Sequence, residues 1–216
     1  MIKAVLFDFD MTLVDSSYAI TEGMNFIARN EGLRELSREE VMSIIGLPIE
    51  ESWAMVWGRF DERWLESYRR SFKETEYSGI DLFPGTIDLL QSLKRLGILS
   101  AVASNRTNVQ SAVEAMKLMS YFSFAIGLQD VENAKPAPDL VIKGMEMLGV
   151  EPREVLYVGD TCADMQCASS AGVRGVGMMT GNSTHEKLRE AGAWVTLEDI
   201  AGILPLVEAE QVILDH

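Results

Sequence analysis

The stretch Ala4-Val-Leu-Phe-Asp-Phe-Asp10, near the start of this 216-residue chain, indicates the fold class. It is a short apolar run that ends in acidic residues, which is typical of a strand buried on both faces whose carboxyl end meets solvent. Similar runs occur later in the chain. They cover residues 98–104, 154–160 and 174–178, with a weaker candidate at residues 123–126.

Helical patterns lie between these runs, and three of them stop at a glycine, the residue that suits a left-handed helix terminus. The expected helices span residues 86–96, 108–119, 139–148 and 164–171. Strands alternate with helices, and no two-residue hairpin signal occurs. We therefore expect an α/β fold, with a doubly wound, Rossmann-like parallel sheet covered by helices on both faces.

Residues 16–79 have a different pattern, because they contain no convincing strand and several helical patterns in succession. Ser37-Arg-Glu-Glu40 has the form of a capping box, and aromatic residues from Trp53 to Trp64 recur at helical spacing. Such aromatic stripes more often fill a core than bind a ligand. We expect an inserted all-helical cap over the carboxyl edge of the sheet. The predicted domains are a core of residues 1–15 and 80–216 and a cap of residues 16–79.

The composition is that of an ordinary globular protein, and its charge excludes some partners. There are 19 Lys and Arg against 33 Asp and Glu, so the formal net charge is −14. Such a chain repels nucleic-acid phosphates and anionic lipid alike, and we expect neither nucleic acid nor membrane as a partner. No run of about 18 apolar residues occurs, so no membrane span is expected.

The first residues are not expected to be a secretory signal, because their apolar stretch is short and two aspartates break it. The chain has two cysteines, Cys162 and Cys167, which are too few for a disulfide framework or a structural zinc site. A reducing, cytoplasmic location fits this best. The sequence does not indicate an oligomeric state.

Four polar segments each follow a predicted strand, at the edge where open α/β sheets bind ligands. Their polar residues are Asp8 and Asp10, Ser104 and Asn105, Lys135, and Asp160 and Asp164. Each residue alone is better explained as a helix cap, a turn former or a solvated charge. Together they crowd four carboxylates that would repel one another without a cation. Carboxylates without a His or Cys cluster make a hard oxygen site, which suits Mg²⁺ better than zinc.

These segments resemble, in order, the four motifs of the haloacid dehalogenase superfamily of aspartate-nucleophile phosphatases. The matching segments are Asp8–Ser16, Val102–Asn105, Ala134–Asp139 and Val158–Met165. The helical insertion resembles the small cap of the phosphoglycolate phosphatase and β-phosphoglucomutase branch. Within it, Gly46, Leu47 and Pro48 are similar to that branch's substrate-facing loop, and we expect them to select the substrate.

The resemblance implies a Mg²⁺-dependent phosphatase that acts on a small phosphorylated metabolite, such as phosphoglycolate or a sugar phosphate. Asp8 would attack phosphorus to give an aspartyl-phosphate, and Asp10 would act first as acid and then as base. The implied phosphate-binding residues are Met11, Thr12, Ser104, Asn105 and Lys135. The implied metal-binding residues are Asp8, Asp10 through its carbonyl, Asp160 and Asp164, the last acting through a metal-bound water or by orienting Lys135.

One residue departs from the family pattern, since Met11 stands where glycine is usual. A left-handed backbone at this position would cost methionine about 1 kcal/mol or more. We expect instead that the position tolerates a side chain while its backbone N–H faces the phosphate.

Other functions for the same motifs stay open. A phosphomutase or a phosphonate hydrolase of the family is an alternative enzyme, and a phospho-accepting signalling module is the alternative outside the enzymes. The second acid, Asp10, and the cap favour an enzyme. The crossings at residues 15–17 and 78–81 are candidate hinges for closure of the cap. Arg34 and Arg38 are candidates to face the leaving group.

Overall fold

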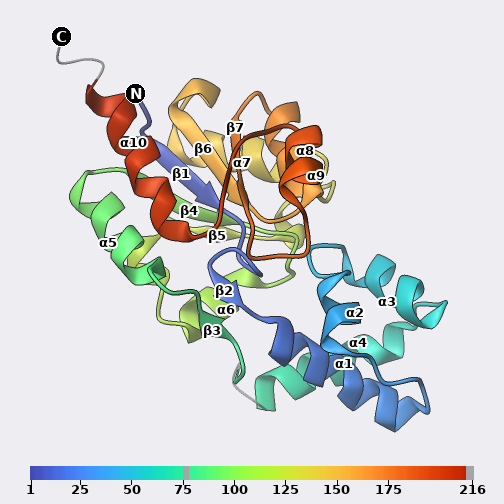
Figure 1. Cartoon of the computed structure of the whole chain (residues 1–216). Coiled ribbons are helices and arrows are strands. Elements are labelled where there is room, and N and C mark those ends of the chain that lie inside the picture. The colour runs from blue at the N-terminus through green and yellow to red at the C-terminus, as the bar shows by residue number, and fades with distance from the viewer. Residues whose placement is uncertain (75–77, 213–216) are drawn as a thin grey trace.

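The computed structural model describes residues 1–74 and 78–212, and a six-stranded parallel sheet forms its centre (Figure 1). The strand order is β5-β4-β1-β6-β7-β8. The strands are β1 (Ala4–Phe7), β4 (Leu99–Ala103), β5 (Ala125–Ile126), β6 (Val155–Gly159), β7 (Arg174–Met178) and β8 (Ala193–Leu197). Because β1 lies between β4 and β6, the chain order reverses there. This switch point is where sheets of this kind bind ligands.

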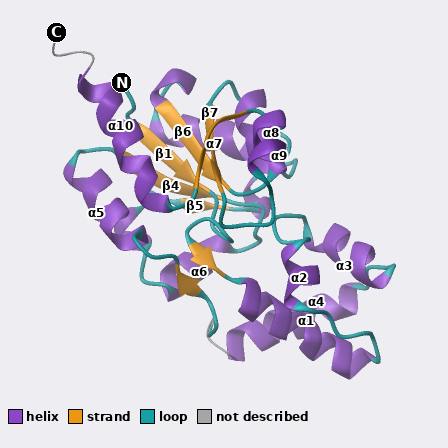
Figure 2. Ribbon diagram, viewed as in Figure 1, coloured by secondary structure: helices purple, strands orange, loops and turns teal. Residues whose placement is uncertain are grey.

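Helices cover both faces of the sheet, as predicted (Figure 2). One face carries α5 (Thr86–Arg95), α6 (Val109–Ala115) and α10 (Ile203–Val212), and the other carries α7 (Asp139–Leu148) and α8 (Cys162–Ser170). The helix α9 (His185–Glu190) packs on β7 and β8. Single 3₁₀ turns occur at Met119–Tyr121, Leu128–Asp130, Pro152–Glu154 and Ile200–Gly202.

The alternation of side chains along each strand explains why both faces need cover. On β1, Val5 and Phe7 belong to one apolar cluster, whereas Ala4 and Leu6 belong to the cluster on the opposite face. All four residues are fully buried. A strand with no solvent-facing side reads as a continuous apolar run, which is the pattern seen in the sequence.

The edge strand β8 was not predicted, and α6 is shorter than predicted. The residues of β8 are half-buried or exposed, so they do not form the apolar run that marks the central strands. The helix α6 ends at Ala115 instead of reaching Met119, and Lys117 has a φ of 59°. A left-handed residue cannot continue an α-helix, so the chain turns there.

Four helices between β1 and α5 form a cluster with its own apolar core. They are α1 (Ser17–Glu31), α2 (Arg38–Met42), α3 (Ile49–Trp57) and α4 (Glu62–Glu74). The ring of Trp53 meets the rings of Trp57, Phe60, Trp64 and Tyr68 at centroid distances of 5.5–6.0 Å. Trp53 and Trp64 are 1% exposed. The aromatic stripe therefore fills a core, as predicted.

The chain enters and leaves this helical cluster through two short strands. They are β2 (Val14–Asp15) and β3 (Asp81–Leu82), which pair antiparallel with each other. At the same crossing, Arg38 lies 3.0 Å from Asp15 and donates a hydrogen bond to the Ser17 hydroxyl. Strand pairing thus holds the two crossings side by side, and the ion pair joins α2 to the first of them. In the described part of the chain, no helix is long and apolar enough to cross a membrane.

Replacing Trp53 by alanine should lower the free energy of unfolding by about 3–5 kcal/mol, because a large buried ring is lost from the centre of the aromatic cluster. Urea denaturation followed by circular dichroism measures this change. Trp53→Phe keeps most of the packing and should cost less. A loss below about 1 kcal/mol in Trp53→Ala would contradict a packing role for this ring.

Candidate active site

The first site residue, Asp8, follows β1 at the point where the chain order of the sheet reverses. Its backbone N–H donates to the carbonyl of Val158 on β6, and its side chain is buried. The chain then turns tightly, with Leu13 N–H bonded to the Phe9 carbonyl. This turn brings Asp10 to the same cavity as Asp8. The strand ends early enough for two acids separated by one residue to share a site.

Met11 occupies the tightest point of this turn, with a φ of 58°. The loop therefore does need a left-handed backbone, and methionine carries the steric cost that glycine would avoid. Its N–H donates to the Val14 carbonyl at 2.8 Å, so the expectation that this N–H faces a phosphate is not met. The Met11 carbonyl accepts a hydrogen bond from the Thr180 hydroxyl. Met11 therefore shapes the loop by its backbone.

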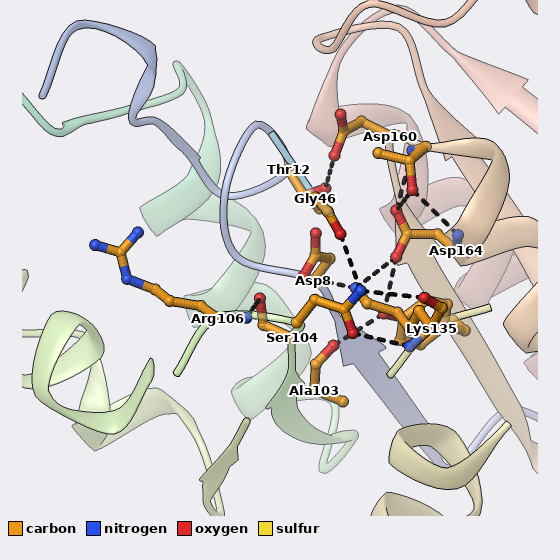
Figure 3. Close-up of polar contacts among 12 residues, drawn as sticks. Asp8, Thr12, Gly46, Ala103, Ser104, Arg106, Lys135, Asp160 and Asp164 are labelled. Atoms are coloured by element: carbon orange, nitrogen blue, oxygen red, sulfur yellow. Dashed lines mark hydrogen bonds and ion pairs between the residues drawn. The ribbon is translucent and has the colours of Figure 1, made fainter. Parts of the chain in front are cut away.

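Lys135 is the cation at the centre of the site (Figure 3). Its Nζ lies 2.9 Å from Asp8 Oδ1 and 2.6 Å from Asp164 Oδ1, and it donates to the Tyr157 hydroxyl at 3.0 Å. Burial would lower the pKa of Lys135, but the carboxylates of Asp164 and Asp8 outweigh burial and hold this pKa above its ordinary value. Lys135 therefore stays charged although its side chain is 1% exposed.

The acids around Lys135 are short of positive charge. Burial raises the pKa of Asp8 to about 6, even though Lys135 lowers it. Burial, with the charges of Asp164 and Asp8, also raises the pKa of Asp160 well above its usual value. One lysine does not compensate three buried carboxylates, so protonation of these acids is favoured unless another cation binds.

The three acids fit a divalent cation. One carboxylate oxygen from each of Asp8, Asp160 and Asp164 lies within 4.8 Å of the others. Asp8 Oδ1 is buried, and among the described residues its ion-pair contact is with Lys135 Nζ at 2.9 Å. Hard oxygen ligands with unsatisfied charge are what a small divalent ion requires. The structure thus brings together all three predicted metal-binding side chains, and the fourth predicted ligand is the backbone carbonyl of Asp10.

The loops after β6 and β7 fix the positions of these acids. Thr12 donates to Asp160 at 3.0 Å. Thr161 caps α8, and Asp164 N–H donates to its hydroxyl at 3.1 Å. A Cβ atom on Gly181 would lie 1.9 Å from Asp160 Oδ2, so only glycine fits beside this carboxylate. Helix α8 therefore begins two residues earlier than predicted, which places Asp164 in its first turn facing Lys135.

The segment after β4 connects three parts of the site. Asn105 Nδ2 donates to the Gly46 carbonyl at 2.9 Å, and Asn105 Oδ1 accepts from Lys135 N–H at 2.9 Å. Ser104 Oγ accepts from Arg106 N–H at 3.2 Å. The side chain of Asn105 therefore joins the loop after β4, the Lys135 loop and the helical cluster.

A cavity of about 570 Å³ lies between the sheet edge and the helical cluster. Its lining includes Asp8, Asp10, Ser104 and Asn105 from the sheet side and Gly46 and Leu47 from the helical side. The other predicted site residues are not among those that line the cavity. They are Met11, Thr12, Pro48, Lys135, Asp160 and Asp164.

Two arginines that were expected to face the leaving group do not line this cavity. Arg34 pairs with Glu40 at 2.7 Å on the exposed side of the helical cluster. Arg38 pairs with Asp15 at the crossing. Local acidic neighbours satisfy both guanidinium groups, which is why they turn away from the cavity.

Sequence reasoning missed Arg106 and Tyr157. Arg106 Nη1 donates to Asp10 Oδ1 at 2.7 Å, and this ion pair is largely buried. Tyr157 lies within the buried strand β6, where its neighbours in the sequence give no sign of a polar role. Its hydroxyl accepts a hydrogen bond from Lys135 and donates one to Asp164. The sequence did offer one sign of a role for Arg106, which is its position directly after Ser104 and Asn105.

Comparison with known proteins agrees with this geometry. Residues 5–178 match the haloacid dehalogenase-like hydrolase family. Phosphoglycolate phosphatase of Escherichia coli (strain K12) is 29% identical over 94% of this chain and 92% of its own length. A solved structure described as a predicted phosphoglycolate phosphatase from Haemophilus somnus 129pt superposes with a TM-score of 0.84 at 25% identity, over 95% of this chain and 97% of that one. A β-phosphoglucomutase from Clostridium difficile shares the fold, with a TM-score of 0.80 at 21% identity over 98% of this chain and all of that one.

The chain belongs to the haloacid dehalogenase-like hydrolase family. Within that family it is a phosphatase of the phosphoglycolate phosphatase-like branch, as its similarity to curated phosphatases over nearly its whole length shows.

Replacing Lys135 by methionine should destabilise the protein by about 3–5 kcal/mol, because the buried acids lose their cation. In the unaltered chain the pKa of Asp8 is raised to about 6, although Lys135 lowers it. Without Lys135 this pKa should rise further, so Asp8 of the variant should keep its proton to a higher pH. A protonated carboxyl needs no cation, and the loss of stability should therefore be smaller at pH 5 than at pH 8. Denaturant unfolding at both pH values measures this. Lys94→Met, at an exposed lysine, is the charge-matched control and should be nearly neutral. An equal loss at the two pH values would contradict the electrostatic explanation.

Proposed function

We propose that this phosphatase is Mg²⁺-dependent and hydrolyses a small organic phosphate monoester through an aspartyl-phosphate on Asp8. The observation that supports this most is the position of Asp8. Its buried carboxylate lies at the switch point of the sheet, 2.9 Å from Lys135, and lines the cavity together with Asp10 and Ser104. A nucleophile, a candidate acid and a hydroxyl donor thus surround one volume that can hold a phosphoryl group.

Asp8 and Asp10 would divide the chemistry. Asp8 Oδ attacks phosphorus, and the P–O bond to the leaving alcohol breaks as Asp10 donates a proton to that oxygen. Asp10 then takes a proton from a water that attacks the aspartyl-phosphate, which releases inorganic phosphate and restores Asp8. The Ser104 hydroxyl and the backbone around Asn105 would donate hydrogen bonds to the phosphoryl oxygens, because the Asn105 side-chain amide already donates to the carbonyls of Gly46 and Lys135. Lys135 offsets charge on Asp8 throughout.

Positive charge is the first requirement of this site. Asp10 and Arg106 form an ion pair of their own, so the other three acids and Lys135 leave a net charge of −2, which a phosphate dianion would meet directly. Each close pair of like charges costs about 4 kcal/mol at an effective dielectric constant of 20. Asp8, Asp160 and the Asp10 carbonyl would hold Mg²⁺, with Asp164 orienting Lys135. When bound, the ion neutralises this charge and polarises the phosphoryl oxygens.

The helical cluster would act as a cap that selects the substrate. We assign residues 16–79 to the cap and residues 1–15 and 80–216 to the core. The loop of Gly46, Leu47 and Pro48 is the proposed selecting element. The Asn105 bond to Gly46 and the close packing of Gly46 on Thr161 support this, because the loop touches two of the four motifs. Closure over the site would exclude water from the reaction.

Asp8→Asn tests the nucleophile, since it keeps the size of the side chain and removes its charge. Turnover of phosphoglycolate and of sugar phosphates should be abolished, while circular dichroism reports an unchanged fold. Release of inorganic phosphate by the unaltered chain, with Mg²⁺ and with EDTA, is the reference measurement. Asp88→Asn, at an exposed position in the first turn of α5, is the control and should retain activity. Substantial hydrolysis by folded Asp8→Asn would refute the assignment, and phosphate transfer to a second hydroxyl without phosphate release would favour a mutase.

Mg²⁺ should raise the melting temperature, and more at pH 7.5 than at pH 5. Burial raises the pKa of Asp8 to about 6, so the folded, metal-free chain binds a proton more tightly than the unfolded chain and loses stability as pH rises towards 6. The ion binds the ionised form, and its stabilisation therefore grows over the same range. At 100 times the dissociation constant it reaches about 2.7 kcal/mol. Thermal unfolding with Mg²⁺ or EDTA checks this. If Mg²⁺ raises the melting temperature of Asp160→Asn as much as that of the unaltered chain, the ion does not bind at Asp160.

A further inference from the structure

The carboxamide of Asn105 joins the helical cluster to the sheet side of the site (Figure 3). Its Nδ2 donates to the Gly46 carbonyl at 2.9 Å and to the Lys135 carbonyl at 3.3 Å. Its Oδ1 accepts from the Lys135 N–H at 2.9 Å. An amide nitrogen carries two N–H donors, so both have these protein partners only while the Gly46 loop is in place. The hydrogen bonding of this side chain therefore depends on where the loop lies.

The same side chain holds the backbone of Lys135 at two points, its N–H and its carbonyl. The other end of this residue, Nζ, lies 2.9 Å from Asp8 Oδ1 and 2.6 Å from Asp164 Oδ1. A shift of the Lys135 backbone would move the ammonium group relative to the Asp8 carboxylate. Charged groups stabilise a transition state best when they are already in place. The Gly46 loop is thus connected to the proposed nucleophile through Asn105 and Lys135.

Gly46 reaches Lys135 by a second route, through Thr161 and Asp164. A Cβ atom on Gly46 would lie 2.9 Å from Thr161 Cγ2, so the loop packs directly on this residue. The Thr161 hydroxyl donates to Asp164 Oδ2 at 2.6 Å, and Asp164 Oδ1 accepts from Lys135 Nζ. One route therefore fixes the backbone of Lys135 and the other fixes its ammonium group. Neither route passes through the leaving group of a substrate.

We propose that Asn105 is a positioning residue that couples the seating of the Gly46 loop to the placement of Lys135, so that the site is complete only while this loop is seated. This inference rests on the proposed phosphatase function and deepens it. The loop then has a second task besides selecting the substrate, because it supports phosphoryl transfer to Asp8 for every ester. Loss of the link should lower kcat whatever the leaving group is.

The test measures kcat and KM for phosphoglycolate and for 4-nitrophenyl phosphate, two esters with unlike leaving groups. Asn105→Ala removes the link from the sheet side. It should lower kcat for both esters by a similar factor of about 10 to 100, which corresponds to one or two lost hydrogen bonds, with a smaller change in KM. A loss confined to phosphoglycolate, or one confined to KM, would overturn the proposal, because the loop would then act on the leaving group alone.

Gly46→Ala weakens the link from the side of the helical cluster, because the added methyl group meets Thr161 Cγ2. It should lower kcat for both esters. Thr161→Ser removes that methyl contact and keeps the hydroxyl that binds Asp164, so Gly46→Ala/Thr161→Ser should recover part of the loss relative to Thr161→Ser alone. Asn105→Ala and Gly46→Ala break one link, and the double variant should therefore lose little more than the worse single variant. Losses that multiply would show that the two residues act independently and would overturn the proposal.

Gly58→Ala is the matched control, because Gly58 also has a left-handed backbone, with a φ of 76°, but a Cβ atom there meets nothing within 4 Å. It should leave kcat unchanged for both esters. Circular dichroism checks that each variant folds. If Asn105→Ala does not fold, Gly46→Ala decides, since an unaltered kcat in that variant contradicts the coupling and a loss that Thr161→Ser relieves supports it. Hydrolysis of neither ester by the unaltered chain would instead refute the proposed function itself.

Discussion

The buried ammonium group of Lys135 is the interaction on which the rest of the site depends. It contacts Asp8, which follows β1, and Asp164, which lies in the first turn of α8, and the two acids in turn keep it charged. Without it, the edge of the sheet would hold three carboxylates within 4.8 Å and no fixed cation. The same shortage of positive charge makes the site receptive to a divalent ion. Holding these charges close together lowers the stability of the fold, but it fixes in advance the charged groups that would interact with a phosphate and its cation.

The sheet edge and the helical cluster meet through polar contacts and through a few half-buried apolar side chains. Asn105 reaches the Gly46 carbonyl, and Ile20 of α1 and Tyr68 of α4 pack against the apolar clusters of both the sheet and the helices. Polar contacts of this kind break and form more readily than packed cores. The cavity lies at the boundary between the sheet and the helical cluster, and residues of both line it.

The sequence predicted those parts of the molecule that local patterns encode. The buried strands could be predicted because each is a continuous apolar run in the sequence. Their terminal acids, such as Asp8 and Asp160, could be predicted because they directly follow such a run. The edge strand β8 has no such apolar run, because its residues are half-buried or exposed. The pairing of Arg106 with Asp10 joins positions 96 residues apart, and the turn of Arg38 towards Asp15 depends on how the crossing packs. Such partners follow from tertiary structure, so no local pattern could indicate them.

The glycine beside Asp160 has a consequence for any attempt to cut or recombine this chain. The segment shared with the family ends at residue 178, but Thr180 holds the Met11 carbonyl and Gly181 leaves room for the Asp160 carboxylate. A fragment that stopped with β7 would retain every motif acid and still lose two supports of the loop that carries them. A chimaera that took the segment after β7 from another protein would have to keep a glycine at this point. The smallest working unit of this enzyme is therefore longer than its motifs.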